Sequence, residues 1–393
     1  MKKAERQCSR RKRRFAVRLA VLGAAMAGIF FVPQPVCAAQ QDTYNLEEEL
    51  LSELPVSEIQ DVLNRDDSTS DLSFSEILHR VLEADGATDK REIAVQILHL
   101  VTGDMAEYKT LFVQLLLVTA AFAFLHNFMN VFENGQISKT CFYLYFLVLM
   151  TLLMKSYLLI HDLLGRVLDT TVDFMEALLP AFCMTMVFSS SQVTAAAFYQ
   201  LSLIVIYLVE RVLTRFVVPG IHIYVVLQML NYMTGEKLIS RLTGLLKSVL
   251  TWGMRILLAG VTGMNMVENM IAPSLDNLKK MSVTKTISMI PGLGNTAEAV
   301  GNIFFGSAIV IKNGVGVTAL ILLMCICMGP LIKMTVFAFL YQSAGANVQP
   351  FADKRVCGCI SSVGDGAMLL FRALLTGVLL FMITIAIVVT AIR

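Results

Sequence analysis

The segment that decides the fold is Pro330-Leu331-Ile332-Lys333-Met334-Thr335-Val336. It aligns with an earlier segment, Pro219-Gly220-Ile221-His222-Ile223-Tyr224-Val225, at an offset of 111 residues, and the same offset relates Pro180 to Pro291. Farther on the offset becomes 114, and Gly244, Ser248, Met254, Ala259, Thr262 and Gly263 fall on Gly358, Ser362, Met368, Ala373, Thr376 and Gly377. Both copies are strongly apolar, which favours a polytopic membrane protein built from two repeats. Chance recurrence of common membrane residues is the alternative.

The composition also indicates a membrane protein. The chain is 56% hydrophobic and 16% charged, with a mean hydropathy of +0.68, whereas soluble domains contain about 25% charged residues. The net charge of +2 hides an uneven distribution, because residues 1–39 carry nine Lys/Arg and one Glu while residues 40–110 carry seventeen Asp/Glu and five Lys/Arg. This division excludes a nucleic-acid-binding footprint and an acidic class of protein.

Residues 1–39 form a predicted signal peptide. A basic region over Lys2–Arg18 precedes an apolar region over Leu19–Val32, and small residues then allow cleavage after Ala38 or Ala39. The alternative is an uncleaved anchor helix, although the apolar run is short for a span of about 20 residues. Cleavage places the region that follows, residues 40–108, on the extracytoplasmic side of the membrane.

Residues 40–108 are predicted to form a few short amphipathic helices. Ile59, Val62 and Leu63 share one helical face. Ser73-Phe74-Ser75-Glu76 has the spacing of a capping box and precedes another apolar stripe. About 70 residues make a marginal core. The region is therefore either a docking arm for an extracytoplasmic partner or a small helical cap packed on the spans.

The rest of the chain is predicted to be an all-α, polytopic helical membrane protein with six to eight spans, because lipid offers the backbone no hydrogen-bond partners. Residues 109–175 hold the N-terminal transmembrane helices, residues 176–275 the first membrane repeat and residues 287–393 the second. The candidate spans are Leu111–Phe132, Cys141–Ile160, Ala195–Glu210, Phe216–Met233, Leu250–Val267, Val315–Tyr341 and Leu369–Ile392.

Pro180 and Pro291 each precede a segment of mixed polarity, Ala181–Gln192 in the first repeat and Gly292–Asn302 in the second. Interrupted segments at matching positions of two repeats are typical of broken or re-entrant helices. An ordinary loop followed by an interfacial helix is the alternative. The basic residues leave the orientation of the repeats open: two spans per repeat make the copies parallel, and three make them antiparallel.

Polar and hinge-forming residues inside the apolar runs are the candidate functional positions. A charge inside the membrane usually faces protein or water, and glycines let helices approach closely. The candidates for lining a path or forming a hinge are Glu268, Pro291, Gly294, Lys312, Gly314, Gly316, Pro330 and Lys333, together with the repeat-paired Pro180 and Pro219. Snorkelling at span ends and interhelical ion pairs are the structural alternatives.

The sequence lacks the motifs of an enzyme. The five histidines are scattered, and no H-E-x-x-H, Gly-x-Ser-x-Gly or phosphate-binding loop is present. The pairs Cys325/Cys327 and Cys357/Cys359 do not have the spacing of structural zinc sites. We therefore expect no catalytic residues, no metal and no cofactor.

One part of the chain is similar to a known family. Its residues are Thr284–Gly294, Gly306-Ser307, Lys312–Gly316 and Asn347–Arg355. With the signal peptide and the acidic region, they make the chain resemble the stage III sporulation protein AE family of endospore-forming Firmicutes. The resemblance runs from about residue 100 to the end, and the acidic region matches in character alone.

The resemblance implies a component of the sporulation A complex in the mother-cell membrane around the forespore. Its partners would be the other proteins of that complex, including a separate ATPase and ring-forming components, with homo-oligomers as a further option. The expected function is a non-enzymatic, multi-pass component of a channel or secretion complex required for forespore development. The alternative is a secondary transporter with a solute or ion site between the repeats, and a third option is a structural scaffold.

Overall fold

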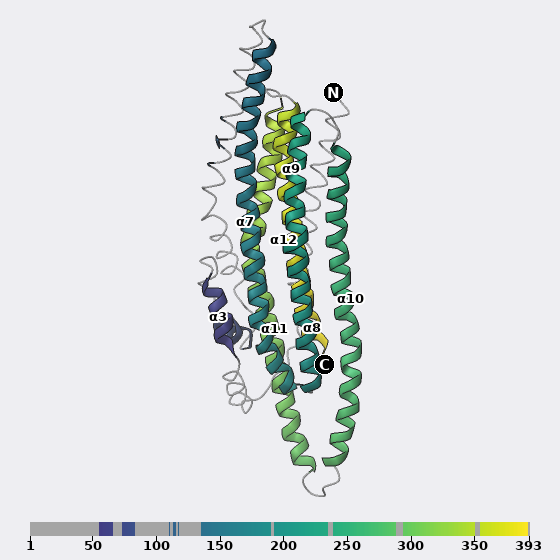
Figure 1. The fold of residues 1–393 in the computed structure, drawn as a ribbon. Helices are drawn as coiled ribbons and strands as arrows, with labels where there is room; N and C mark the ends of the chain where they lie inside the picture. Colours follow the sequence, from purple (N-terminus) through teal and green to yellow (C-terminus); the bar gives the residue numbers. More distant parts are fainter. Residues whose placement is uncertain are drawn as a thin grey trace, which may run out of the picture. The chain divides into compact units, whose positions relative to one another are not determined.

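The computed structural model describes residues 55–65, 73–82, 110, 113–114, 117, 135–189, 192–234, 239–287, 294–349 and 354–391, and nearly all of them are helical. They all fall within one compact unit, Asn45–Arg393. The helices are α3 (Val56–Arg65), α4 (Phe74–Leu82), α7 (Gly135–Ser189), α8 (Gln192–Val212), the π-helix η2 (Leu213–Val217), α9 (Val218–Thr234), α10 (Ser240–Ile287), α11 (Gly294–Asn347) and α12 (Lys354–Ala391) (Figure 1). The predicted all-α fold class is thus confirmed.

Four helices are long and apolar enough to cross a membrane in the part of the chain that is described. Their apolar parts are Tyr143–Val187, Ser240–Met264, Gly306–Asn347 and Lys354–Ile387. The predicted spans Ala195–Glu210 and Phe216–Met233 lie on one unbroken helical run, because α8, η2 and α9 follow each other without a gap. The count of six to eight spans stays a prediction, and Leu111–Phe132 lies almost wholly outside the described residues.

The longest helices continue through their prolines. α7 holds Pro180 inside its 55 residues, and α11 holds Pro330 inside its 54. The expectation of a broken or re-entrant segment after Pro180 is wrong for residues 181–189, where the backbone is continuous helix. A proline removes one helical hydrogen bond, and packing against neighbouring helices makes that loss tolerable. In the second repeat, α11 already begins at Gly294, and Pro291 lies outside the described residues.

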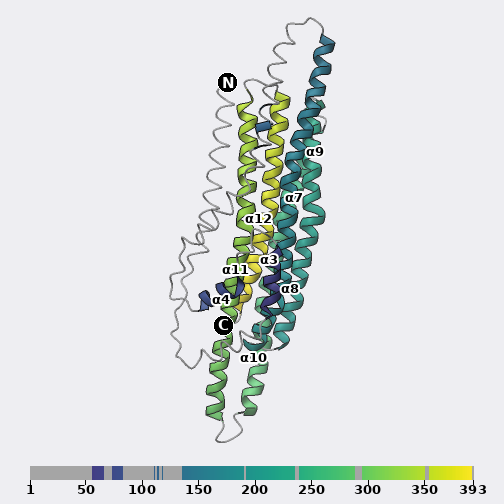
Figure 2. The same ribbon diagram turned by 90° about the vertical axis from the view of Figure 1, so that its left-hand side faces the viewer.

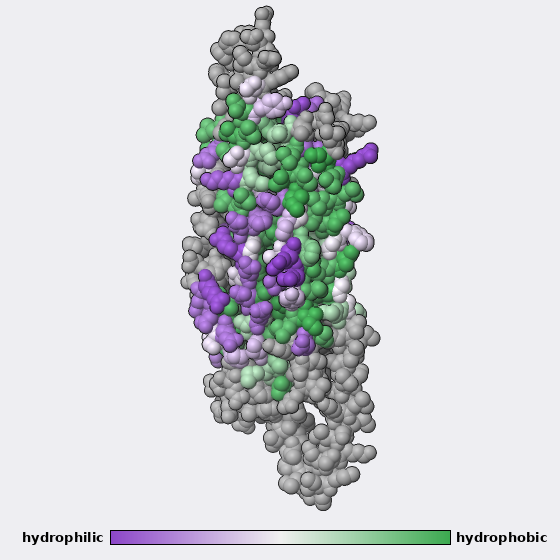
Figure 3. All heavy atoms as spheres, viewed as in Figure 1, coloured by the Kyte–Doolittle hydropathy of each residue, from purple (hydrophilic) through white to green (hydrophobic). Residues whose placement is uncertain are grey.

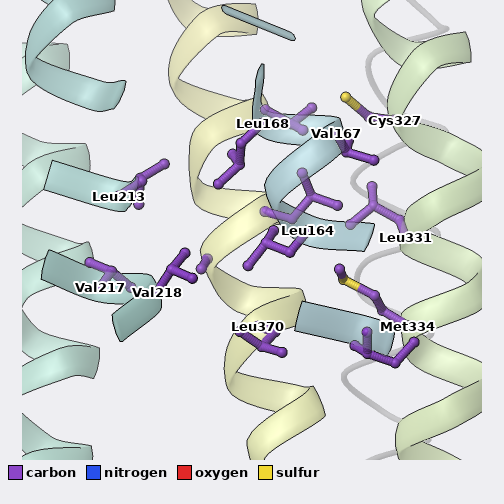
Figure 4. Packing of buried hydrophobic residues seen from close by; sticks show 14 of the residues in the cluster. Leu164, Val167, Leu168, Leu213, Val217, Val218, Cys327, Leu331, Met334 and Leu370 are labelled. Carbon is purple, nitrogen blue, oxygen red and sulfur yellow. The ribbon is translucent and has the colours of Figure 1, made fainter. Parts of the chain in front are cut away.

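Helix α12 is the centre of the bundle. It packs most extensively against α11 and also against α9, α7 and α10. Figure 1 shows α7 and α10 on opposite sides of it, and Figure 2 shows the same bundle turned by a quarter. Figure 4 shows the apolar side chains that fill the space between α7, η2, α11 and α12: Leu164, Leu168, Leu213, Val217, Leu331, Met334 and Leu370.

The helices of the two sequence repeats form two hairpins that run in the same directions. In Figure 1, α8, η2 and α9 run parallel to α11, whereas α10 and α12 run the opposite way. The first residues of α10 and α12, Ser240 and Lys354, keep the offset of 114 found in the sequence. Gly220 lies at a close contact within the first hairpin, since a Cβ there would be 2.6 Å from Leu250 Cδ2. These features agree with two parallel copies of two helices each, although the duplication itself stays a prediction.

The amphipathic helices of the acidic region pack on the long helices. Ile59 and Leu63 are completely buried, as the apolar stripe predicted, and Phe74 is completely buried as well. The Glu76 amide donates to Ser73 Oγ over 3.4 Å, which is one half of the expected capping box. α3 lies against α7, and α4 lies against α11. The described part of the region is therefore a cap on the bundle.

Candidate functional site

Helix α11 buries two lysines inside its apolar span. Lys312 is completely buried and Lys333 is 7% exposed. Snorkelling to a span end therefore does not describe either residue. The two lysines are 21 positions apart, which corresponds to about 31 Å along the helix. They belong to different levels of the bundle, and a role in lining a path stays a prediction for each.

Gly314 and Gly316 are positions of close helix approach, as the sequence predicted for this motif. A Cβ on Gly314 would lie 2.6 Å from Leu82 Cδ2 of α4. A Cβ on Gly316 would collide with Val389 of α12 and meet Phe182 of α7. These contacts bring α4, α7 and α12 onto one turn of α11, next to Lys312. The helix is continuous there, so hinge bending at this motif remains a prediction.

The other predicted positions are spread over the bundle. Pro330 lies one turn before Lys333 in α11, Pro180 lies in α7, and Pro219 is the second residue of α9, directly after the π-helix. Glu268 belongs to α10 and Gly294 opens α11, but their surroundings lie outside the described residues, as do Pro291, Ala38 and Ala39 altogether.

An ion pair that was not predicted from the sequence joins the two hairpins. Lys247 Nζ of α10 lies 3.4 Å from Asp365 Oδ2 of α12. The same ammonium lies 5.6 Å from the centre of the Tyr224 ring of α9. Lys247 lies about two turns inside α10.

Three aromatic rings gather beside this ion pair. The ring centroids of His161 and His222 lie 5.6 Å apart, and Tyr157 lies 6.1 Å from His161 and 5.7 Å from His222. Glycine at position 366 leaves room for the Tyr157 ring and for Val225. Histidines that are scattered in sequence thus meet across α7 and α9.

We call Tyr157, His161, His222, Lys247 and Asp365 the polar cluster. Among the described residues, the buried Tyr157 hydroxyl and His222 Nδ1 have no hydrogen-bond partner, and neither does Gln228 Oε1 of α9. Such atoms usually bind water or a ligand. The one sequence signal for the cluster is that His222 occupies the place of Lys333 in the repeat comparison, three residues after a proline in both copies.

The chemistry available to the polar cluster is proton exchange and the binding of water or a small ion. Imidazole, carboxylate and ammonium groups all change or carry charge. Over the described ranges, no group of three or more His, Cys, Asp or Glu side chains is placed to hold a metal ion.

Comparisons with known proteins identify the family. The family model for stage III sporulation protein AE matches residues 72–392. The chain is 24% identical over 278 residues to the stage III sporulation protein AE of Bacillus subtilis (strain 168), and the match covers 70% of each chain. No solved structure matches. With the family model matching most of its length, this membrane chain belongs to the stage III sporulation protein AE family.

Proposed function

We propose that the protein is a multi-pass component of a sporulation-specific channel or secretion complex that links mother cell and forespore and is required for forespore development. Its family is a sporulation membrane family and not a known enzyme family. The observation that carries the proposal is Lys333, a cation held inside the most apolar of the long helices. A buried charge in a membrane is costly, so it is retained where it has a function.

In this proposal α11 and α12 form the fixed core, and the polar groups line or brace the path. The signal peptide places α3 and α4 on the extracytoplasmic side, facing the space between the two membranes. Energy comes from the separate ATPase of the sporulation A complex, and ring-forming components of that complex contact the extracytoplasmic end. The protein itself lies in the mother-cell membrane around the forespore.

Replacing Lys333 tests the proposal. Lys333→Leu removes the charge and leaves a shorter, apolar side chain, so the helix stays in the membrane. We expect a loss of heat-resistant spores with an unchanged amount of protein in the membrane fraction. Lys354→Leu is the matched control, because Lys354 is exposed at the start of α12. Normal spore yield from Lys333→Leu would show that this lysine only packs.

A second candidate function is secondary transport, and the polar cluster favours it. The Lys247–Asp365 pair joins the two hairpins, and unpartnered polar atoms lie close by. Binding sites between repeats are common in transporters. Uptake of a solute or an ion by the purified protein in vesicles, lost in Asp365→Asn, would support this function. Absence of uptake together with a sporulation defect of Lys333→Leu would favour the complex component, and silent substitutions at every buried charge would favour a scaffold.

A further inference from the structure

Exposed charged side chains form two groups on the long helices, in addition to single exposed charges such as Lys155, Arg241 and Lys354. On α7, Asp162, Arg166, Asp169 and Glu176 are exposed, and the side chain of Asp173 is 47% exposed. Their spacing of three and four residues puts them in one stripe. Figure 3 shows hydrophilic residues gathered along the side of the molecule that carries α3 and α7. We call these five residues the acidic face, because four are carboxylates and one is a guanidinium.

The second face has the opposite sign. Arg211 of α8, Arg215 of η2 and Arg255 of α10 are exposed, and Glu210 beside them is half-buried. Arg211 also lies over the Tyr207 ring, at 5.7 Å from its centre. These helices are neighbours, since α10 packs against α8, η2 and α9. The three arginines form the basic face.

The two faces lie at the same level along the bundle. A Cβ on Gly377 of α12 would meet both Leu213 of η2 and Leu168 of α7, so these residues are level with each other. Leu213 lies between Arg211 and Arg215, and Leu168 precedes Asp169.

A second contact fixes the level of α10. Gly220 lies at the same height as Leu250 of α10. Arg215 precedes Gly220 by five residues, and Arg255 follows Leu250 by five residues. Because the two helices are antiparallel, both steps go in the same direction along the bundle, so Arg215 and Arg255 also lie at the same height.

Contact with lipid is unfavourable for the charged side chains of both faces. α7 and α10 are the least buried of the four long apolar helices. In the most apolar 18-residue stretch of each helix, 33% of the residues of α7 and 22% of those of α10 are buried, compared with 56% for α11 and 61% for α12. Apolar side chains flank the charges, among them Leu158 on α7 and Trp252 and Ile256 on α10, which are 39%, 65% and 51% exposed. Charges among apolar side chains at the rim of a membrane bundle usually face protein or water.

We propose that copies of this chain associate head to tail, with the acidic face of one copy against the basic face of the next. Four carboxylates and one guanidinium on one side match three guanidiniums and one carboxylate on the other, at equal height and on opposite sides of α12. Contacts between different faces of identical subunits generate rings or chains. Asp173 already pairs with Arg65 of α3 within the chain. A second copy supplies complementary charge for the rest of the acidic face, and the flanking side chains supply an apolar border.

Charge reversal in full-length chains tests this association. Two differently tagged copies are expressed together, and copurification in detergent is measured. Asp169→Arg in both copies, or Arg215→Asp in both copies, should lower copurification more than about tenfold, because like charges then oppose each other. Arg355→Asp, at an exposed site on the start of α12, is the matched control and should leave copurification unchanged.

The decisive sample mixes one Asp169→Arg copy with one Arg215→Asp copy. The Asp169→Arg copy keeps an unaltered basic face and the Arg215→Asp copy keeps an unaltered acidic face. These two faces can dock as in the wild type, so copurification should recover. Recovery also shows that both variants fold. Copurification that survives either reversal overturns the proposal, as does a mixed pair that fails to associate although each variant elutes as a single species. A wild-type chain that is monomeric in lipid nanodiscs also overturns it and assigns the faces to a different protein.

Discussion

The docking of α4 on α11 can be tested at Gly314. In Gly314→Ala the new Cβ would lie 2.6 Å from Leu82 Cδ2 and 3.2 Å from Leu82 Cγ, so either the Leu82 side chain leaves its packed position or α4 shifts away. Overpacking of this kind costs about 1–3 kcal/mol. Alanine also favours helix in α11 by about 1 kcal/mol, but α11 is helical whether α4 is docked or not. That gain therefore does not change the docking equilibrium.

The expected effect follows from this free energy. Since about 1.4 kcal/mol is a factor of ten, the opening equilibrium of α4 should rise roughly 5- to 150-fold. Hydrogen exchange of the amides in Phe74–Leu82, measured in nanodiscs, reports this opening directly.

Two further variants make the result specific. Gly306→Ala is the matched control on the same helix, because no atom lies within 4 Å of a Cβ at that position. Adding Leu82→Ala to Gly314→Ala removes the colliding side chain and should bring the effect of the glycine substitution close to zero, relative to Leu82→Ala alone. Unchanged exchange in Gly314→Ala, or an equal increase in Gly306→Ala, would refute the argument.

Three further predictions follow from ion pairs and helix direction. Arg65→Ala should change the stability of the protein by less than about 1 kcal/mol in thermal unfolding, because the pair with α7 is largely exposed; a loss of several kcal/mol would contradict this. Lys247→Met alone should lower the midpoint of thermal unfolding, and adding Asp365→Leu should restore part of it, because the single change removes the ammonium that pairs with a half-buried carboxylate; additive losses would argue against coupling. Arg241→Cys and Lys354→Cys should react with an impermeant thiol reagent from the same side of the membrane, because α10 and α12 start at the same end; labelling from opposite sides would exclude parallel hairpins.

The helical fold could be predicted because the apolar runs are long and a lipid environment leaves helices as the answer. The boundaries of the helices could be predicted less well. The π-helix Leu213–Val217 joins two predicted spans into one run. A sequence shows a proline at position 219 but not the wider turn that precedes it. The break expected after Pro180 was wrong for a related reason, since the cost of a proline depends on packing that the sequence does not show.

The candidate site was predicted in part. Lys312 and Lys333 stand out because a charge interrupts an apolar run, and both are buried. The His161–His222 contact depends on how α7 lies against α9, which no local pattern specifies. The Lys247–Asp365 pair was not predicted, because its two residues are 118 positions apart in sequence.

The length of α7 has a mechanical consequence. Its 55 residues extend about 80 Å, which exceeds the hydrocarbon thickness of about 30 Å by some 50 Å. Such a helix acts as a lever whose pivot is the bilayer. A tilt of about 10° around its middle would displace each end by about 7 Å in opposite directions. A force applied to one end of the helix would thus move the other end without any change in the helix itself.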